Sequence, residues 1–362
     1  MRLTQAGCRQ RQQQVAAALT HRGLRGAVLS RRDHVLYLTG FLCGRHHAAA
    51  LYIDASARVW LAGAGVPADT AVDEVIPYEP ARHATMHSQQ AEAVAAALAA
   101  VVPRGVPLGT DAGGGSGCAC ALAGADASDV TGDLVRLRQR KLPDEVDAIR
   151  AAVRVTEALY AAARDVVQPG VDEIEVLAQL RAVGTRAAGE DLEHFGNDFQ
   201  ANSPGGPARP RPMQAGELYI LDAGPSLHGY FADNCRTFAV GRQPTDAQAR
   251  AWEDLDALFP RLEAAVAPGV PAASVFRLAD EYLRERGYAG LVHHLGHGIG
   301  LAPHEAPQLN PAYDAVFAVG DVFTMEPGVY GPELRAGIRL EEDYLLAEDG
   351  LVRLTSFPRS LV

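Results

Sequence analysis

The chain has 362 residues, a formal net charge of −11 and a hydrophobic content of 48%. This length exceeds one typical core, so two domains are expected, and the apolar content is ample for packed globular ones. The acidic charge argues against a nucleic-acid partner, and no run reaches the ~18 apolar residues of a membrane helix. Five cysteines without a CxxC pair, together with an N-terminus that lacks an apolar signal core, predict a cytoplasmic protein.

The first 130 residues or so mix helical patterns with short apolar runs. A helix is expected over 9–22, stopping at Gly23, and another over 88–101, before Pro103. Apolar runs of strand length, bounded by turn residues, predict strands at 26–30, 34–38, 49–53 and 58–62. Strands mixed with helices in this way indicate an α/β unit.

The basic run RLRQRK at 136–141 has the composition of an ordinary charged surface and is interpreted as the solvated start of a linker helix. Pro143 and the two acids after it are typical of a helix N-terminus, because proline fits the first turn and acids favour the helix dipole. That helix is expected to end near residue 166, and another follows Gly170.

Further helices are expected later in the chain. Thr245 and Gln248 have the spacing of a capping box, and Pro271 opens a helix that ends at Gly287. The second half therefore consists of helices that flank two strand-pair units. We place the domain boundary near 130–140, which predicts domains at 1–132 and 133–362.

Two matched segments in the second half are the most informative feature of the chain. Residues 215–224 read AGELYILDAG, and residues 319–328 read VGDVFTMEPG. Each has a glycine and an acid, then strand-forming residues, then a second acid before a further glycine. The second acids, Asp222 and Glu326, are 104 residues apart, and so are Gly216 and Gly320, as their positions in the sequence show.

Each matched segment is followed by one more carboxylate across a turn-rich connection. Asp233 follows Asp222, and Glu341 follows Glu326, so a hairpin in each unit would place two acids on facing strands. Four carboxylates would then converge in one core. Buried carboxylates crowded together are unfavourable unless cations neutralise them, and the simplest neutraliser is a pair of divalent metal ions.

A histidine-rich segment, HHLGHGIGLAPHEAP at 293–307, lies between the two units. Its His297 is flanked by glycines, which allow the backbone to approach closely, and His293 and His304 lie on either side of it. Four carboxylates and one imidazole suit two ions such as Mn²⁺ or Co²⁺, which can share a water and lower its pKa. Taken singly, each of these residues has an ordinary structural interpretation; their occurrence together with the internal repeat favours a site.

These motifs resemble those of the metallopeptidase family that includes Xaa-Pro dipeptidases (prolidases), aminopeptidase P and methionine aminopeptidase, the M24 family. The resemblance implies an α/β creatinase-like N-terminal domain followed by an α+β pita-bread catalytic domain. The segments that carry it are HVLYLTGF (34–41), RLRQRKLPDEVDAIRAAV (136–153), ILDAGPSLHGYFADNCRTFAVG (220–241), GHGIGLAPHE (296–305), TMEPGVY (324–330) and GIRLEEDYLL (337–346).

The resemblance also implies roles for individual residues. Two divalent ions, foremost Mn²⁺ with Co²⁺ or Zn²⁺ as alternatives, would be held by Asp222, Asp233, His297, Glu326 and Glu341. Asp233 and Glu341 would bridge the two ions, and Glu326 would also carry a proton toward the leaving proline nitrogen.

Three more residues are implicated in the same way. His304 would stabilise the tetrahedral intermediate, and His293 would lie near the substrate. Arg339 would steady the bridging carboxylates from behind and contribute to substrate binding.

The sequence departs from the usual prolidase pattern around the substrate. Residues 199–217 contain no histidine, and residues 305–325 contain no arginine or lysine, so the usual clamp for a dipeptide carboxylate is missing. Another cation could take that part, and we favour Arg45, on the loop after LTGF, as a substrate-binding residue. The candidates for the clamp are Arg45, Arg209, Arg211 and Arg335.

The expected function is the metal-dependent hydrolysis of Xaa-Pro dipeptides. The missing clamp keeps open an aminopeptidase P, which would release the residue before proline from longer peptides. A non-catalytic peptide-binding relative and a hydrolase of a non-peptide amide are further alternatives. The expected partner is a small peptide with proline at its second position, and the resemblance implies a homodimer.

Overall fold

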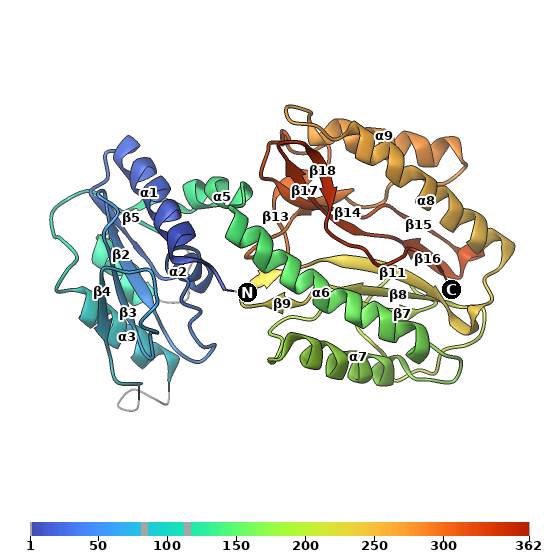
Figure 1. Cartoon of the computed structure of the whole chain (residues 1–362), viewed down its shortest axis with the longest axis horizontal. Coiled ribbons are helices and arrows are strands. Elements are labelled where there is room, and N and C mark those ends of the chain that lie inside the picture. Colours follow the sequence, from blue (N-terminus) through green and yellow to red (C-terminus); the bar gives the residue numbers. More distant parts are fainter. Residues whose placement is uncertain (1, 81–85, 112–116, 362) are drawn as a thin grey trace. The chain divides into compact units, whose positions relative to one another are not determined.

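The structure is a computed structural model in which residues 2–80, 86–111 and 117–361 are described. Contacts between residues divide the chain into two compact units, Met1–Arg138 and Gln139–Val362, and each unit mixes helices and strands (Figure 1). The predicted combination of a mixed α/β first domain with a separate α+β second domain is thus confirmed in outline. Among the described helices, none combines the length and the hydropathy that a bilayer-spanning segment needs.

The first unit is built on one mixed sheet with the strand order β4-β3-β2-β1-β5-β6. The central strands β1, β2 and β3 are antiparallel neighbours, whereas β4, β5 and β6 are added in parallel. The central strands are almost wholly buried, which is why they read as continuous apolar runs. The strands are β1 (Gly26–Leu29), β2 (Ala50–Asp54), β3 (Val59–Gly63), β4 (Glu74–Pro77), β5 (Leu108–Thr110) and β6 (Ser128–Asp129).

Helices pack against this sheet, and one of them overturns a prediction. Residues 34–38, expected to be a strand, lie in helix α2, in which every residue from His34 to Thr39 is buried. A helix buried on all sides shows no 3.6-residue period, so its short apolar run resembles a strand. Gly40 ends this helix with a φ of 75°. The helices of the unit are α1 (Gln5–His21), α2 (Arg32–Thr39), α3 (His87–Leu98), α4 (Gly117–Cys120) and α5 (Thr131–Gln139).

The expectation that the basic run 136–141 is solvated is wrong for two of its members. Arg138 and Lys141 are only 4% and 7% exposed. Each is buried with a carboxylate of its own unit, Arg138 with Asp33 and Lys141 with Glu305. Long cationic side chains can be taken out of water when an acid pairs with them, and a charge count along the sequence does not reveal such partners.

The second unit contains several groups of antiparallel strands. One sheet has the order β11-β8-β7, another β13-β12-β14-β17-β18, and β15 pairs with β16 in a hairpin. The strands are β7 (Asp198–Ala201), β8 (Leu218–Ala223), β9 (Ser226–Leu227), β10 (Tyr230–Phe231), β11 (Asn234–Ala239), β12 (Gly296–Gly298), β13 (Glu305–Leu309), β14 (Val322–Met325), β15 (Gly328–Gly331), β16 (Ala336–Arg339), β17 (Glu342–Ala347) and β18 (Gly350–Arg353).

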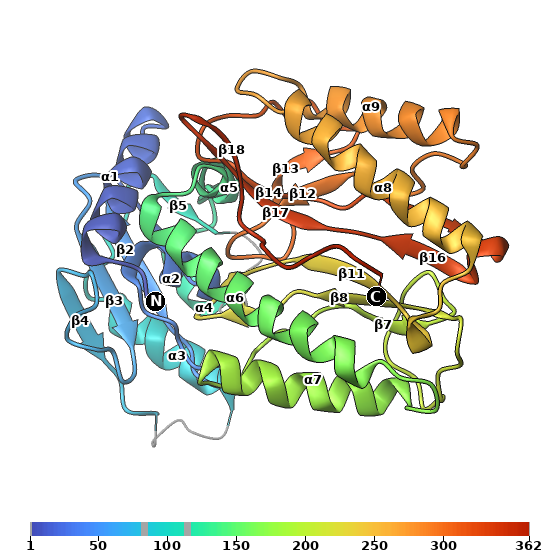
Figure 2. The same ribbon diagram turned by 45° about the vertical axis from the view of Figure 1, so that its right-hand side comes forward.

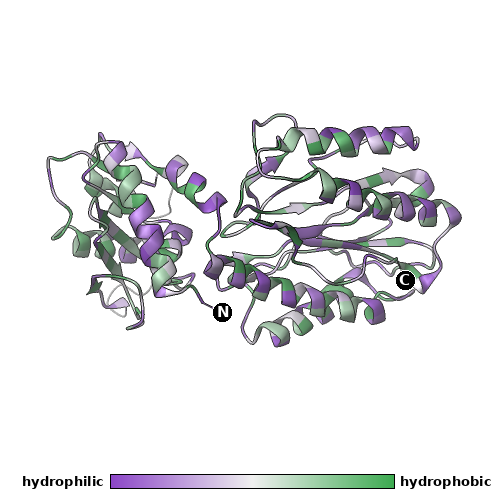
Figure 3. Cartoon of the chain, turned by 45° about the horizontal axis from the view of Figure 1, so that its top comes forward, coloured by the Kyte–Doolittle hydropathy of each residue, from purple (hydrophilic) through white to green (hydrophobic). Residues whose placement is uncertain are grey.

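Two pairs of helices cover the strands of this unit. Figures 1 and 2 show α6 and α7 along one side of the strands and α8 and α9 along the other. Hydrophilic and hydrophobic residues alternate along them (Figure 3), as expected of helices that bury one face. The helices are α6 (Pro143–Val166), α7 (Glu173–Ala188), α8 (Asp246–Ala265) and α9 (Ala272–Glu285).

The start signals of these helices were predicted correctly. Helix α6 begins at Pro143 and ends at Val166, and Pro271 is the N-cap of α9. The hydroxyl of Thr245 accepts from the backbone N–H of Gln248, whose side chain accepts from the N–H of Thr245, forming the expected capping box. Local chemistry at helix ends is therefore readable in this chain without tertiary information.

The internal repeat corresponds to two equivalent strand entries. Gly216 and Gly320 have φ values of 81° and 93°, a region that glycine adopts at little cost. The N–H of Gly216 bonds to the carbonyl of Val240, and that of Gly320 bonds to the carbonyl of Leu346, in each case on the far side of an antiparallel pair. Both glycines turn the chain into the strand that precedes an acidic residue of the candidate site.

Candidate active site

The five candidate metal ligands lie at or near the ends of strands of the second unit. Asp222 lies near the end of β8, Asp233 directly precedes β11, and Glu326 directly follows β14. His297 is the central residue of β12, and Glu341 directly precedes β17. All five are nearly excluded from solvent, with exposures of 8% for Asp222, 5% for Asp233, 5% for His297, 8% for Glu326 and 1% for Glu341.

The side chains of this group face one another. Ligand atoms of Asp233, His297 and Glu341 all lie within 4.8 Å of one another. Nε2 of His297 is 3.4 Å from Oε1 of Glu326 and 3.8 Å from Oδ2 of Asp233. The predicted hairpins produce this convergence, because the β8–β11 and β15–β16 pairs each return the chain beside its starting acid.

The orientation of His297 suits a cation between it and the acids. Nδ1 of this ring is 3.1 Å from the carbonyl of Gly298, so Nδ1 carries the proton and the lone pair of Nε2 faces the carboxylates. Burial lowers the pKa of His297 to about 4, which keeps the ring neutral at neutral pH. A lone pair that faces carboxylate oxygens is repulsive unless a positive ion lies between them.

Crowding and burial shift the pKa values of the four carboxylates. Burial raises the pKa of Asp222 to about 6, although Arg339 opposes the shift. Burial, together with the charges of the neighbouring acids, holds the pKa of Asp233 and of Glu341 well above the usual range. Burial also disfavours ionisation of Glu326, but a hydrogen bond from His294 and the other nearby imidazoles bring its pKa down to about 2.

Two oxygens of this group lack any hydrogen-bond donor among the described residues. They are Oδ1 of Asp222 and Oε2 of Glu341, both buried. Buried polar atoms are normally paired, and a bound ion is one explanation for an orphan. The donor set is four carboxylates and one imidazole, and the nearby thiol of Cys235 is kept neutral by burial, which raises its pKa. This chemistry fits divalent ions that prefer oxygen ligands with some nitrogen.

Arg339 lies behind Asp222 and not behind the two acids that it was expected to steady. One of its terminal nitrogens, Nη2, is 2.7 Å from Oδ2 of Asp222 and also contacts Asp198. The other, Nη1, is 3.1 Å from the hydroxyl of Tyr330. The guanidinium therefore joins the candidate ligand Asp222 to a second carboxylate that the sequence did not single out.

Asp198 was missed because nothing in its sequence surroundings marks it. It lies on β7 directly opposite Asp222 on β8, a register that only the folded sheet establishes. Its Oδ1 accepts a hydrogen bond of 2.6 Å from the N–H of Gly206. Asp198 thereby ties Arg339 to the segment 202–206, within the stretch that lacks the histidine usual in prolidases.

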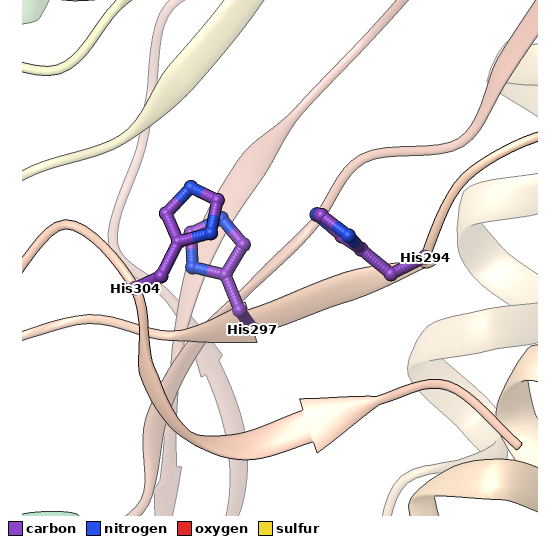
Figure 4. Close-up of side chains that lie close together, drawn as sticks. All are labelled: His294, His297 and His304. Atoms are coloured by element: carbon purple, nitrogen blue, oxygen red, sulfur yellow. The ribbon is translucent and has the colours of Figure 1, made fainter. Parts of the chain in front are cut away.

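Three imidazoles gather beside the carboxylates, and one of them was not predicted. Figure 4 shows the rings of His304 and His297 overlapping, with His294 opposite them. His294 places Nε2 2.8 Å from Oε1 of Glu326, whereas Nε2 of the predicted His293 is 2.9 Å from the hydroxyl of Tyr330. The two histidines are adjacent in the sequence, so the sequence alone does not show which of them contacts Glu326.

The three imidazoles do not form a closed metal site of their own. The rings of His297 and His304 are stacked, with centroids 3.7 Å apart and planes 14° apart. Ring-nitrogen lone pairs lie in the ring plane, so two nearly parallel rings do not aim at one ion. His304 therefore lies over His297 with its nitrogens available to another group, as a side chain that contacts substrate requires.

The clamp candidates of the second unit are already engaged. Arg209 contacts Glu173 at 2.6 Å, and Arg211 pairs with Glu217. Arg335 lies 3.5 Å from the carbonyl of Gly216, at the start of β8. In the first unit, Arg45 lines a cavity of about 120 Å³ together with Arg32, His47 and His87, and no acid is among the described residues that line it.

The known proteins that this chain resembles are metallopeptidases and dipeptidases. The profile described as "Metallopeptidase family M24" matches residues 147–348. The chain is 31% identical to a Xaa-Pro dipeptidase of Pyrococcus furiosus over 62% of its own length and 66% of that protein. It is 27% identical to the "Putative dipeptidase YkvY" of Bacillus subtilis over 97% of its own length and 98% of that protein.

The fold is also shared with a solved structure. A Xaa-Pro dipeptidase from Bacillus anthracis superposes with a TM-score of 0.82 at 24% identity, covering 98% of this chain and 99% of that one. At this level of identity the likeness shows the architecture alone. It matches the α/β plus α+β arrangement described above.

Proposed function

Because the chain belongs to metallopeptidase family M24, in its prolidase and aminopeptidase P branch, we propose that it is a metal-dependent Xaa-Pro dipeptidase. Membership of this family makes the chain a hydrolase. The observation that supports the finer proposal is the buried group of four carboxylates and one imidazole, with two unpartnered oxygens. Such a group has no evident structural purpose, because crowded like charges destabilise the fold that holds them.

We propose that Asp222, Asp233, His297, Glu326 and Glu341 would hold two divalent ions, with Asp233 and Glu341 contributing as the resemblance implies. Mn²⁺ is the first choice, and Co²⁺ or Zn²⁺ are alternatives for the same ligands. When bound, such a pair of ions lowers the pKa of a water and polarises a scissile carbonyl.

The remaining chemistry belongs to side chains of this protein. The nitrogen of the scissile bond belongs to the proline ring and carries no hydrogen, and it must gain a proton to leave as an amine. Glu326 accepts a proton from the attacking water and passes it to that nitrogen. His304 donates a hydrogen bond to the oxygen on which negative charge develops, and His293, held by Tyr330, lies beside the substrate.

We assign the free carboxylate of the dipeptide to Arg45. The other candidates for this part are engaged elsewhere: Arg209 and Arg211 pair with acids, and Arg335 contacts a backbone carbonyl. The cavity lined by Arg45, Arg32, His47 and His87 is large enough for a carboxylate group and has cationic walls.

One observation favours an aminopeptidase P as the second candidate. Residues 305–325, where prolidases usually have an arginine, contain neither arginine nor lysine. An enzyme without a carboxylate clamp would accept longer peptides as readily as dipeptides. A non-catalytic peptide-binding protein is disfavoured, because all five candidate ligands are present and buried together.

We further propose a cytoplasmic homodimer. Free thiols at Cys8, Cys43, Cys120 and Cys235 support a reducing compartment. The dimer follows from the family resemblance alone. Size-exclusion chromatography with light scattering tests it directly.

The decisive experiment is a substrate panel with metal-stripped protein. Mn²⁺, Co²⁺ or Zn²⁺ would be added back separately, and Leu-Pro would be compared with Leu-Pro-Pro and with Leu-Ala. Metal-dependent cleavage of Leu-Pro in preference to the other two supports a dipeptidase. Preference for Leu-Pro-Pro supports the aminopeptidase, and no cleavage of any proline peptide with any ion overturns both.

A further inference from the structure

Lys141 is buried more deeply than lysine usually is, and its partner adjoins the candidate active site. Its side chain is 1% exposed, and Nζ lies 3.1 Å from Oε1 of Glu305, whose side chain is 9% exposed. The two atoms are in ion-pair contact but are not aligned for a hydrogen bond. Taking both charges out of water is costly, so this pair is not an ordinary ion pair of the protein surface.

Glu305 is joined directly to His304, the residue assigned to transition-state stabilisation. It begins β13, and His304 is the last residue of the connection that leads from β12 into that strand. A Cβ added to Gly300, near the start of the same connection, would lie 2.0 Å from Oε1 of Glu305. The carboxylate therefore packs against the opposite end of the connection and closes it into a compact loop.

Lys141 supports this closed loop from behind. A Cβ on Gly300 would also lie 3.0 Å from Cε of Lys141, so glycine is needed for the lysine stem and the carboxylate to meet there. The carbonyl of Gly300 accepts from the N–H of Phe231 at 2.8 Å, which anchors that end of the loop to β10. The backbone of Lys141 is anchored separately, because its N–H donates to the carbonyl of Gly320 at 2.8 Å.

We infer that Lys141 is a positioning residue, which fixes the Glu305 carboxylate and thereby holds the His304 imidazole in place over His297. The inference rests on the proposed role of His304. No described contact links Lys141 to Asp222, Asp233, His297, Glu326 or Glu341, so its action runs through the loop and not through the metal ligands. Catalytic side chains lose activity when they are displaced by about 1 Å, which makes such support functionally important.

Replacing Lys141 with methionine keeps the length of the side chain and removes its charge. The Glu305 carboxylate then loses its ion pair with Lys141 and shifts, and the adjoining backbone of His304 shifts with it. We expect kcat on Leu-Pro to fall about tenfold or more, with KM within about twofold of wild type, because only the transition-state contact of His304 is disturbed. Bound Mn²⁺, measured by elemental analysis, is expected to stay at two ions per chain.

Two further variants separate positioning from a general loss of structure. The double variant Lys141→Met with Glu305→Gln neutralises both partners, and it is expected to recover most of the lost kcat. In a His304→Ala background, Lys141→Met is expected to reduce kcat by less than about twofold further, because its effect runs through the side chain already removed. Arg138→Met removes another buried cation of the same basic run and serves as the control for lost stability without lost kcat.

The outcomes distinguish this inference from the proposed function. If His304→Ala leaves Leu-Pro hydrolysis unchanged, the proposed role of His304 fails, and the inference fails with it. If His304→Ala is impaired but Lys141→Met has wild-type kcat, or lowers kcat equally in both backgrounds, only the positioning inference is overturned. If Lys141→Met does not fold at assay temperature, the double variant Lys141→Met with Glu305→Gln is used instead. The inference requires that adding His304→Ala to this double variant lowers kcat by the same factor as adding it to wild type, and a smaller factor overturns the inference.

Discussion

Nε2 of His294 lies 2.8 Å from Oε1 of Glu326, so the candidate proton carrier has a partner that the sequence pattern did not identify. This hydrogen bond is a main reason why the pKa of Glu326 stays at about 2 despite its burial. Two adjacent histidines thus have different surroundings: one faces the acid, and the other faces the hydroxyl of Tyr330.

Replacing His294 with alanine should weaken the site through Glu326. Without this partner, burial disfavours the ionised carboxylate, and Glu326 becomes a poorer ligand and a poorer proton acceptor. We expect kcat/KM on Leu-Pro to fall by about tenfold or more and the Mn²⁺ affinity to fall with it. Steady-state kinetics and calorimetric titration of stripped protein measure the two effects. His21→Ala, at the exposed end of α1, is the control, and wild-type values in His294→Ala would show that Glu326 needs no such support.

Asp198 should matter for metal affinity although it is not a candidate ligand. Asp198→Asn removes one of the two carboxylates that share Arg339, so the guanidinium interacts more strongly with Asp222 and competes with an ion for its charge. We expect the Mn²⁺ dissociation constant to rise by about tenfold, within the range typical of residues that support metal ligands. Titration calorimetry gives the value directly. Unchanged affinity would mean that Asp222 is insensitive to how Arg339 is shared.

The metal-free protein should show a pH-dependent cost at Asp222. Burial raises the pKa of this carboxyl to about 6, so its stabilising contribution is present below the unfolded value near 4 and is lost as the pH rises through 6. Asp222→Asn has no charge to bury. We expect stripped wild type and variant to have similar melting temperatures at pH 4.5, and the variant to melt a few degrees higher at pH 7.5.

Mn²⁺ should reverse this order at pH 7.5, because binding to the folded state stabilises a protein that has its full ligand set. Thermal melts with and without the ion check both parts. Comparing the two proteins at each pH cancels the contributions of the nearby histidines, which titrate in the same window. A stripped variant that melts below wild type at pH 7.5 would contradict the proposed charge crowding.

Replacing Arg45 should weaken the binding of substrates that have a free carboxylate and leave other substrates unaffected. If it holds the C-terminus of a dipeptide, Arg45→Ala should raise KM for Leu-Pro by about tenfold or more, since a charged hydrogen bond is lost. Hydrolysis of Leu-Pro amide should change little. Initial-rate kinetics on the two substrates make the comparison, with Arg104→Ala, another exposed arginine of the first unit, as control. Equal losses on acid and amide would reject the proposed clamp.

Local signals in the sequence account for most of the fold. The capping box at Thr245 and the first-turn Pro143 act within one turn of a helix, and the paired glycines at 216 and 320 act through their own backbone angles, so these signals can be read from the chain. The strand predicted at 34–38 failed because α2 is buried all round and therefore lacks helical periodicity. The prediction that the basic run is solvated was wrong for Lys141, because its burial depends on Glu305, more than 160 residues further along the chain.

The four acids of the candidate site were predicted from the chain alone, because two matched segments with hairpin-forming connections make their convergence the simplest arrangement, and the family resemblance added His297. The surroundings of these residues became visible only in the folded chain: His294 and not His293 contacts Glu326, Asp198 shares Arg339 with Asp222, and Lys141 pairs with Glu305 beside His304. The difference lies in how far apart along the chain the interacting residues are. Repeats and turns are encoded in neighbouring residues, whereas strand register, ring orientation and the pairing of buried charges arise only when distant segments pack together.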